Sequence, residues 1–166
     1  YGELAAGVNV GSRARISAGM RSGRLKTERD TGSTVLPDNL TEDETVAFLN
    51  ATYDTRDDIG LPTRGSLIFL EYVHSDSWLG GDQDYDLIEG ILTKAFPWRG
   101  NSLNLIAGGA GTLNGELPPV HDFRLGGLQS YPGQKLDQLR GDSYGFAGSS
   151  YLWKLADIQP LLGQAL

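Results

Sequence analysis

The segment TVAFLNATYDTRDDIGLPTRGSLIFLEYVHS, residues 45–75, decides the fold class because its hydrophobic residues recur at every second position. Ala47, Leu49, Ala51 and Tyr53 point to one side of an extended chain. The polar residues between them point to the other side. A period of two is typical of a β-strand whose two faces meet different surroundings. We therefore expect strands at about 45–55 and 66–75, separated by the compact turn RDDIGLPTRG.

The same alternation continues on both sides of this segment. It predicts five further strands, at about 2–10, 13–29, 85–96, 102–113 and 144–155. Most of these strands are longer than the ~5–6 residues usual in globular proteins. Their lengths suit the ~9–11 residues with which a tilted strand crosses a membrane. The sequence thus predicts an all-β, antiparallel fold of about seven strands in one domain.

The connections between the expected strands alternate in length. They run tight, long, compact, medium, short and very long, from Gly11-Ser12 to the loop at 114–142. Short turns on one side and longer loops on the other are typical of a transmembrane β-barrel. The alternative is a soluble all-β, ligand-binding domain with long hairpins. In the barrel, Glu71 and Glu89 must face a polar lumen or rim, because both lie inside strands.

Composition narrows the function classes. The net charge is −7, with 21 acidic and 14 basic residues, which argues against a nucleic-acid partner. Cysteine is absent, so disulfides and thiolate metal sites are excluded. No apolar run is long enough for a transmembrane helix, which needs roughly 18 residues.

Two segments resemble the bacterial surface antigen superfamily, the outer-membrane barrels of assembly and two-partner secretion systems. YDTRDDIGLPTRG followed by LIFLEY is similar to a strand–turn–strand of that family. FRLGGLQSYPGQKLDQLRG followed by GSSYLWKL resembles its sixth extracellular loop and the next strand. The resemblance covers the chain from about Asn50 to the C-terminus.

The resemblance implies a partial barrel, residues 1–166, from a roughly 16-stranded antiparallel parent. It also implies that the loop at 114–142 folds back into the lumen, where glycines let the backbone pack closely against the wall. An exposed loop that uses glycine and proline only for turns is the alternative. The motif residues implied for the lumen loop are Leu125, Gly126, Gly127, Tyr131, Pro132, Gly133, Gln134, Arg140 and Gly141.

One part of this loop departs from the family pattern. Assembly and secretion barrels carry an Arg-Gly-aromatic core here, whose arginine pairs with an acid on the barrel wall. In this chain Pro132 stands in place of the arginine and Gln134 in place of the aromatic residue. Proline has no charge and no N–H, so that ion pair cannot form. The pattern is most similar to barrels fused behind a patatin-like phospholipase domain.

The sequence offers no complete catalytic or metal-binding motif. A patatin-type lipase needs G-x-S-x-G, and Gly148-Ser149-Ser150 lacks the second glycine. The two histidines, His74 and His121, are expected to be surface or lumen residues rather than catalytic bases. Asp82, Asp84 and Asp86 have D-x-D-x-D spacing, but Leu87 and Thr93 occupy positions where an EF-hand needs glycine and glutamate. We expect no catalysis and no cofactor in this segment.

Three further groups of residues have structural interpretations. Gly108, Gly109 and Gly111 are expected at bends or where the inward loop approaches the wall. The tryptophans near predicted strand ends suit aromatic girdles, with core positions as the alternative: Trp78, Trp98 and Trp153. A charged turn outside the membrane is expected from Asp54, Arg56, Asp57, Asp58 and Arg64.

These observations predict an outer-membrane module that anchors, displays or translocates an attached domain. The expected location is the bacterial outer membrane, with lipid as a partner. A seven-stranded sheet has two unpaired edges, which must close on further strands of a parent chain or on another copy. The attached domain implied by the resemblance is a patatin-like hydrolase, and a general assembly or secretion barrel is the alternative.

Overall fold

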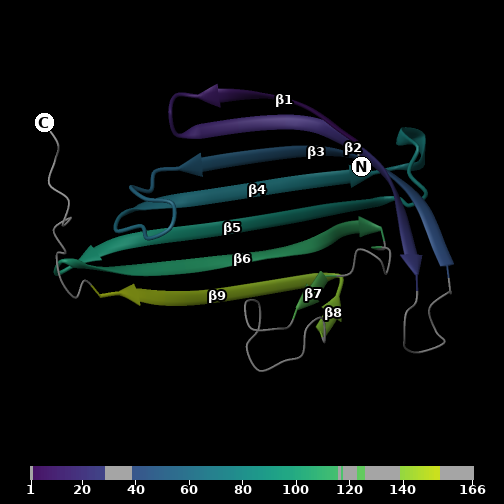
Figure 1. Ribbon diagram of the computed structural model, residues 1–166. Coiled ribbons are helices and arrows are strands. Elements are labelled where there is room, and N and C mark those ends of the chain that lie inside the picture. Colours follow the sequence, from purple (N-terminus) through teal and green to yellow (C-terminus); the bar gives the residue numbers. More distant parts are fainter. Residues whose placement is uncertain (1, 29–38, 116, 118–122, 126–138, 154–166) are drawn as a thin grey trace, which may run out of the picture.

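A computed structural model describes residues 2–28, 39–115, 117, 123–125 and 139–153. Seven antiparallel strands form one open, curved sheet in the order β1-β2-β3-β4-β5-β6-β9 (Figure 1). Their bounds are β1 Gly2–Val10, β2 Ala14–Glu28, β3 Asn39–Asp54, β4 Gly65–Ser75, β5 Tyr85–Trp98, β6 Asn101–Gly115 and β9 Ser143–Leu152. Two short strands, β7 (Phe123–Leu125) and β8 (Leu139–Gly141), form a separate hairpin. The predicted all-β fold with seven long strands is therefore confirmed.

The largest difference from the predicted bounds is at the start of β3. Strand β3 begins at Asn39 rather than near Thr45, because the backbone of this polar segment pairs with the end of β2 as far as Glu28↔Asn39. The Arg24–Asp43 ion pair, 2.6 Å between Nε and Oδ1, stabilises the added rungs of this ladder. The prediction also did not include the two short strands β7 and β8, which lie in the segment 114–142.

The only helix among the described residues is the 3-10 turn η1 (Ser77–Leu79). Asp76 caps its N-terminus by accepting a hydrogen bond from the Trp78 amide, and Gly80 ends it with a φ of 93°. Among all the residues that the structure describes, no helix is long and apolar enough to cross a membrane.

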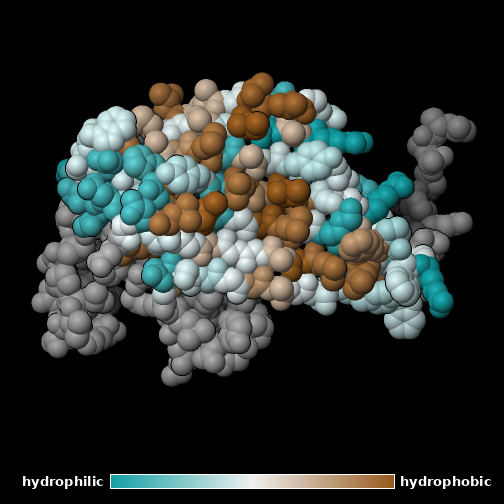
Figure 2. All heavy atoms as spheres, turned by 180° about the vertical axis from the view of Figure 1, so that it is seen from behind, coloured by the Kyte–Doolittle hydropathy of each residue, from teal (hydrophilic) through white to brown (hydrophobic). Residues whose placement is uncertain are grey.

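The sheet has two unlike faces, because directly paired residues on neighbouring strands share a face. The outer face presents exposed apolar side chains over the middle of the strands, which gather as a brown area in Figure 2. They include Leu4, Val8, Ile16, Met20, Leu49, Ile68, Leu70 and Leu92. A wide apolar surface on a sheet face is expected where the solvent is lipid rather than water.

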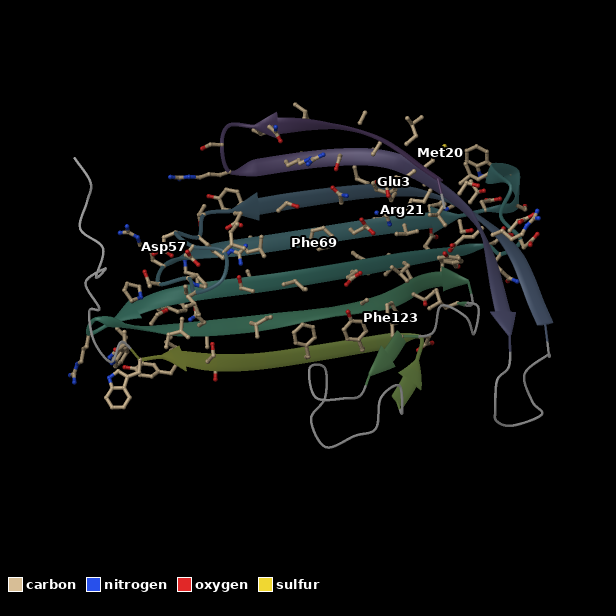
Figure 3. All side chains as sticks on the ribbon, in the orientation of Figure 1. Glu3, Met20, Arg21, Asp57, Phe69 and Phe123 are labelled. Atoms are coloured by element: carbon tan, nitrogen blue, oxygen red, sulfur yellow. The ribbon has the colours of Figure 1, made fainter. Side chains whose placement is uncertain are left out.

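The inner face is more polar. It carries Glu3, Arg21, Asn50, Glu71 and Glu89, which register places on the same side of five neighbouring strands. Figure 3 shows Glu3 and Arg21 side by side on this face. The predicted orientation of Glu71 and Glu89 toward a polar face thus agrees with their register.

The short and longer connections separate to opposite ends of the sheet (Figure 1). At one end lie the turns 11–13, 55–64 and 99–100. The last of these is a two-residue hairpin turn in which Arg99 and Gly100 both have positive φ, 51° and 82°. Such a turn matches the right-handed twist of the strands that it joins. The long connections, including 76–84, leave from the other end.

Candidate functional site

An ion-pair network on the inner face joins three strands. The Arg21 guanidinium donates to both Glu71 carboxylate oxygens, at 2.9 and 3.1 Å, and to Glu3 at 3.0 Å. The guanidinium carbon also lies 4.1 Å from the centre of the Phe48 ring, so the cation rests on an aromatic face. A two-pronged contact of this kind fixes the planes of both groups. The network therefore holds β1, β2 and β4 in one register.

A row of polar residues crosses the wall beside this network. The Ser17 hydroxyl donates to Asn50 Oδ1 at 2.5 Å, and Asn50 Nδ2 donates to Glu71 at 3.4 Å. Glu71 is paired directly with Glu89 across β4 and β5, which places like charges opposite each other. Glu89 accepts from the Tyr144 hydroxyl at 3.4 Å. The two carboxylates therefore have partners in opposite directions along the wall: Glu71 binds Arg21 and Asn50, whereas Glu89 binds Tyr144.

An apolar cluster lies next to the network on the same face. It consists of Val46, Phe48, Val73, Tyr85 and Leu117, with Leu87 and Phe123 packed against it. Leu117 and Phe123 belong to the segment 114–142, and the Phe123 ring meets Tyr144 edge-on with 4.9 Å between centroids. A cavity of about 300 Å³ remains between these side chains and Arg21. Leu117 and Phe123 thus pack on the inner wall.

Most of the predicted lumen-loop motif lies outside the described residues: Gly126, Gly127, Tyr131, Pro132, Gly133 and Gln134. The backbone of Leu125 pairs with Leu139, Arg140 pairs with Arg124, and Gly141 pairs with Phe123 in the hairpin. The role of the motif stays a prediction.

The acidic run does not gather around one point. Asp82 accepts from the Asp43 amide at 2.9 Å, and Asp84 accepts from the Ser77 amide at 2.8 Å. Asp86 instead accepts from Tyr72 at 2.6 Å and lies 2.7 Å from His74 Nδ1, on the outer face. Within the described residues no group of three or more acidic or histidine side chains is placed to hold a metal ion.

The other predicted residues fall mainly on strand ends and tight contacts. Trp78, Trp98 and Trp153 lie at or near element ends and are largely exposed. Ser149 and Ser150 lie within β9, whereas His74 lies on β4, and His121 is outside the described residues. Gly108, Gly109 and Gly111 do lie at close approaches, and their close neighbours among the described residues include backbone or side chains of β9.

The charged turn forms a compact local network. Arg56 donates to Asp54 at 2.8 Å, and Asp58 Oδ1 accepts from the amides of Gly60 and Leu61. Asp57 accepts from the Thr63 hydroxyl and amide, and this lowers its pKa to about 2. The neighbouring Asp54 carboxylate raises the pKa of Arg56. The expectation did not include the contact of this turn with the inner wall, where the Pro62 carbonyl accepts from Ser102 Oγ at 2.9 Å.

The sequence interpretation also missed Arg21. A usable signal was present, since the expected strands at 2–10, 13–29 and 66–75 each carry a charged residue inside the strand: Glu3, Arg21 and Glu71. Only the strand register shows that they meet.

The comparisons with known proteins agree with this geometry. A family model described as the Omp85 superfamily domain matches residues 2–165. No match was found among curated proteins. Since the family match spans nearly the whole chain and the sheet has a polar inner and an apolar outer face, this chain belongs to the Omp85 superfamily, the bacterial surface antigen barrels of the outer membrane.

Proposed function

We propose that this chain forms part of the wall of an outer-membrane assembly or secretion barrel in a bacterial envelope. The observation that carries the proposal is the contrast between the two faces of one sheet. Large apolar side chains are exposed on the outer face, whereas the inner face holds ion pairs and hydrogen-bonded carboxylates. Domains of this superfamily are barrels without catalytic chemistry, so the function is passage, insertion or anchoring.

The proposal includes an orientation in the membrane. The longer connections lie on the outer side and the turns 11–13, 55–64 and 99–100 on the periplasmic side. It also includes inward folding of the loop 114–142, which the packing of Leu117 and Phe123 on the inner cluster supports. Lipid contacts the apolar face, and the free edges of β1 and β9 pair with further strands of a parent chain or another copy.

A labelling experiment on the full-length protein in intact outer membranes tests this proposal. Leu49, on the outer face, and Ser150, on the inner face, are each replaced by cysteine. Both side chains are exposed to a probe in the isolated sheet. We expect a water-soluble maleimide to label the cysteine at 150 and to spare the one at 49 until detergent is added. Equal labelling of both sites, or recovery of the protein without membranes, would contradict the proposal and favour the soluble ligand-binding domain.

A more specific form of the proposal is an attached patatin-like hydrolase domain. Its support is the sequence pattern at Pro132 and Gln134, which departs from the assembly and secretion core. The parent chain would then be heavier than 17.9 kDa and carry a G-x-S-x-G serine. Replacing that serine with alanine should abolish lipid hydrolysis by the parent without changing insertion of the barrel. A parent chain without such a serine would contradict the attached hydrolase, and the general assembly or secretion barrel would remain as the proposed function.

A further inference from the structure

The turn between β3 and β4, residues 55–64, continues the hairpin and then bends over the inner face. Two backbone hydrogen bonds extend the ladder, from Thr55 N to Ser66 O at 2.8 Å and from Asp57 N to Arg64 O at 3.3 Å. Beyond them the chain lies across the inner side of β5, as the turn near Asp57 in Figure 3 shows. We call residues 55–64 the inward turn.

Contacts with the wall show how far the inward turn reaches. The Pro62 carbonyl accepts a hydrogen bond from Ser102 on β6, and Ser102 is only 1% exposed. Strand β6 is the second neighbour of β4, and strands lie ~4.8 Å apart, so the turn reaches about 10 Å across the wall. A groove of about 510 Å³ separates its tip from inner-face residues of β6 and β9, including Asn104, Ile106 and Ser150.

The inward turn has a rigid base and an apolar tip. Its acidic side chains have partners within or beside the turn: Arg56 binds Asp54, Thr63 binds Asp57, and Asp58 accepts two backbone amides. Ile59 and Leu61 are the large apolar side chains that project from the turn, with 85% and 66% of their surface exposed. The tip therefore presents two bulky apolar side chains.

We propose that the inward turn is an apolar constriction at one mouth of the lumen, and that Ile59 and Leu61 set the width of the opening for whatever passes. This inference rests on the proposed barrel function. A solute or polypeptide crossing at this end would meet the tip before it reached the Arg21 network, because the turn lies at the short-turn end of the sheet. Narrowing by apolar side chains restricts flow by pore diameter and by dewetting.

The test uses single-channel conductance of the full-length protein in planar bilayers. Ile59→Cys is modified with a bulky, uncharged thiol reagent, and Ser12→Cys, an exposed site on the turn 11–13 at the same end, is the matched control. These 166 residues contain no native cysteine. We expect modification at position 59 to lower conductance by roughly twofold or more and modification at position 12 to leave it unchanged. A second variant, Ile59→Gly with Leu61→Gly, should raise conductance.

Each other outcome has one meaning. Channels whose conductance responds neither to modification at position 59 nor to the double glycine variant would overturn the constriction alone. An equal fall after modification at positions 12 and 59 would also overturn it, because the effect would not depend on the tip. Failure of the unmodified protein to insert into membranes at all would overturn the barrel function and the constriction with it.

Discussion

Arg21 and Glu71 form a two-pronged ion pair across strand β3, with N–O distances of 2.9 and 3.1 Å. The pair lies wholly within the wall, since Arg21 belongs to β2 and Glu71 to β4. Glu71 is the more buried partner, with 14% of its side chain exposed against 32% for Arg21. The sheet itself therefore supplies the Glu71 carboxylate with a positively charged partner.

This pair predicts unequal effects at two neighbouring glutamates. Glu71→Gln should lower the free energy of unfolding by about 1–3 kcal/mol, because it leaves the partly buried Arg21 without its main carboxylate. Glu89→Gln, directly opposite on β5, should be neutral or stabilising because it removes a like charge from beside Glu71. Urea unfolding of the full-length protein in lipid vesicles, followed by tryptophan fluorescence, measures both changes.

A double-mutant cycle provides the control for this prediction. Arg21→Met combined with Glu71→Gln removes both charges while keeping most of the volume. If the pair interacts as described, the double variant should be more stable than the sum of the two single changes predicts. Additive single effects, or equal losses from Glu71→Gln and Glu89→Gln, would mean that the ion pair does not contribute.

A second prediction concerns the close approach of β1, β2 and β3 at Gly19. A Cβ at this position would meet the Leu4 carbonyl oxygen and would lie 2.8 Å from Phe48 Cζ. Gly19→Ala should therefore cost about 1–3 kcal/mol, as overpacking does elsewhere. In Gly145→Ala the new Cβ has the Gly108 carbonyl at 3.9 Å as its nearest neighbour, so this variant should be near neutral. Equal losses of stability from both variants in the same unfolding measurement would contradict the close approach at Gly19.

The period-two pattern was sufficient to predict the seven long strands and which residues share a face within a strand. Ala47, Leu49, Ala51 and Tyr53 do share one face of β3, because alternation is a local property of the chain. The Arg21–Glu71 pair could not be predicted in the same way, since it depends on the register of two successive strand pairings. A shift of one residue in either pairing would place these charges on opposite faces.

The inward turn shows a second limit of sequence interpretation. The charges at positions 54–64 correctly indicated a turn, and its aspartates form local contacts within or beside it. Its direction depends on Pro62 meeting Ser102, 40 positions later in the chain. Serine inside an alternating strand carries no local signal of such a partner, because Ser102 resembles any other inward-facing polar residue.

The lipid-facing assignment predicts a difference between two apolar residues on opposite faces. Leu70→Arg places a charge in the middle of the apolar outer face, where arginine costs ~2–4 kcal/mol in a membrane barrel. Ile106→Arg places the same charge on the inner face, where Ile106 is 37% exposed and water can reach it. The first variant should unfold at lower urea in vesicles and the second should change little. Equal losses would contradict the assignment of the faces.

The last prediction is a pH dependence of the inward turn. The Thr63 hydroxyl first, and the Thr63 and Arg64 amides with it, lower the pKa of Asp57 from 3.8 to about 2. A carboxyl whose pKa is lower in the folded state stabilises that state above its unfolded pKa, and the contribution disappears as the pH falls through the folded pKa. The conformation of the turn should therefore persist at pH 4 and loosen as the pH approaches 2.

Carbon-13 chemical shifts of the Asp57 carboxyl, measured in detergent micelles between pH 1.5 and 5, report this titration. Thr63→Val removes the largest cause of the shift, so the midpoint should move up toward 3.8, whereas Thr63→Ser keeps the hydroxyl and should leave it near 2. If the apolar constriction depends on an ordered inward turn, Thr63→Val should also broaden the distribution of single-channel currents at neutral pH. A midpoint near 3.8 in the unsubstituted protein would show that the Thr63–Asp57 contact does not hold the turn.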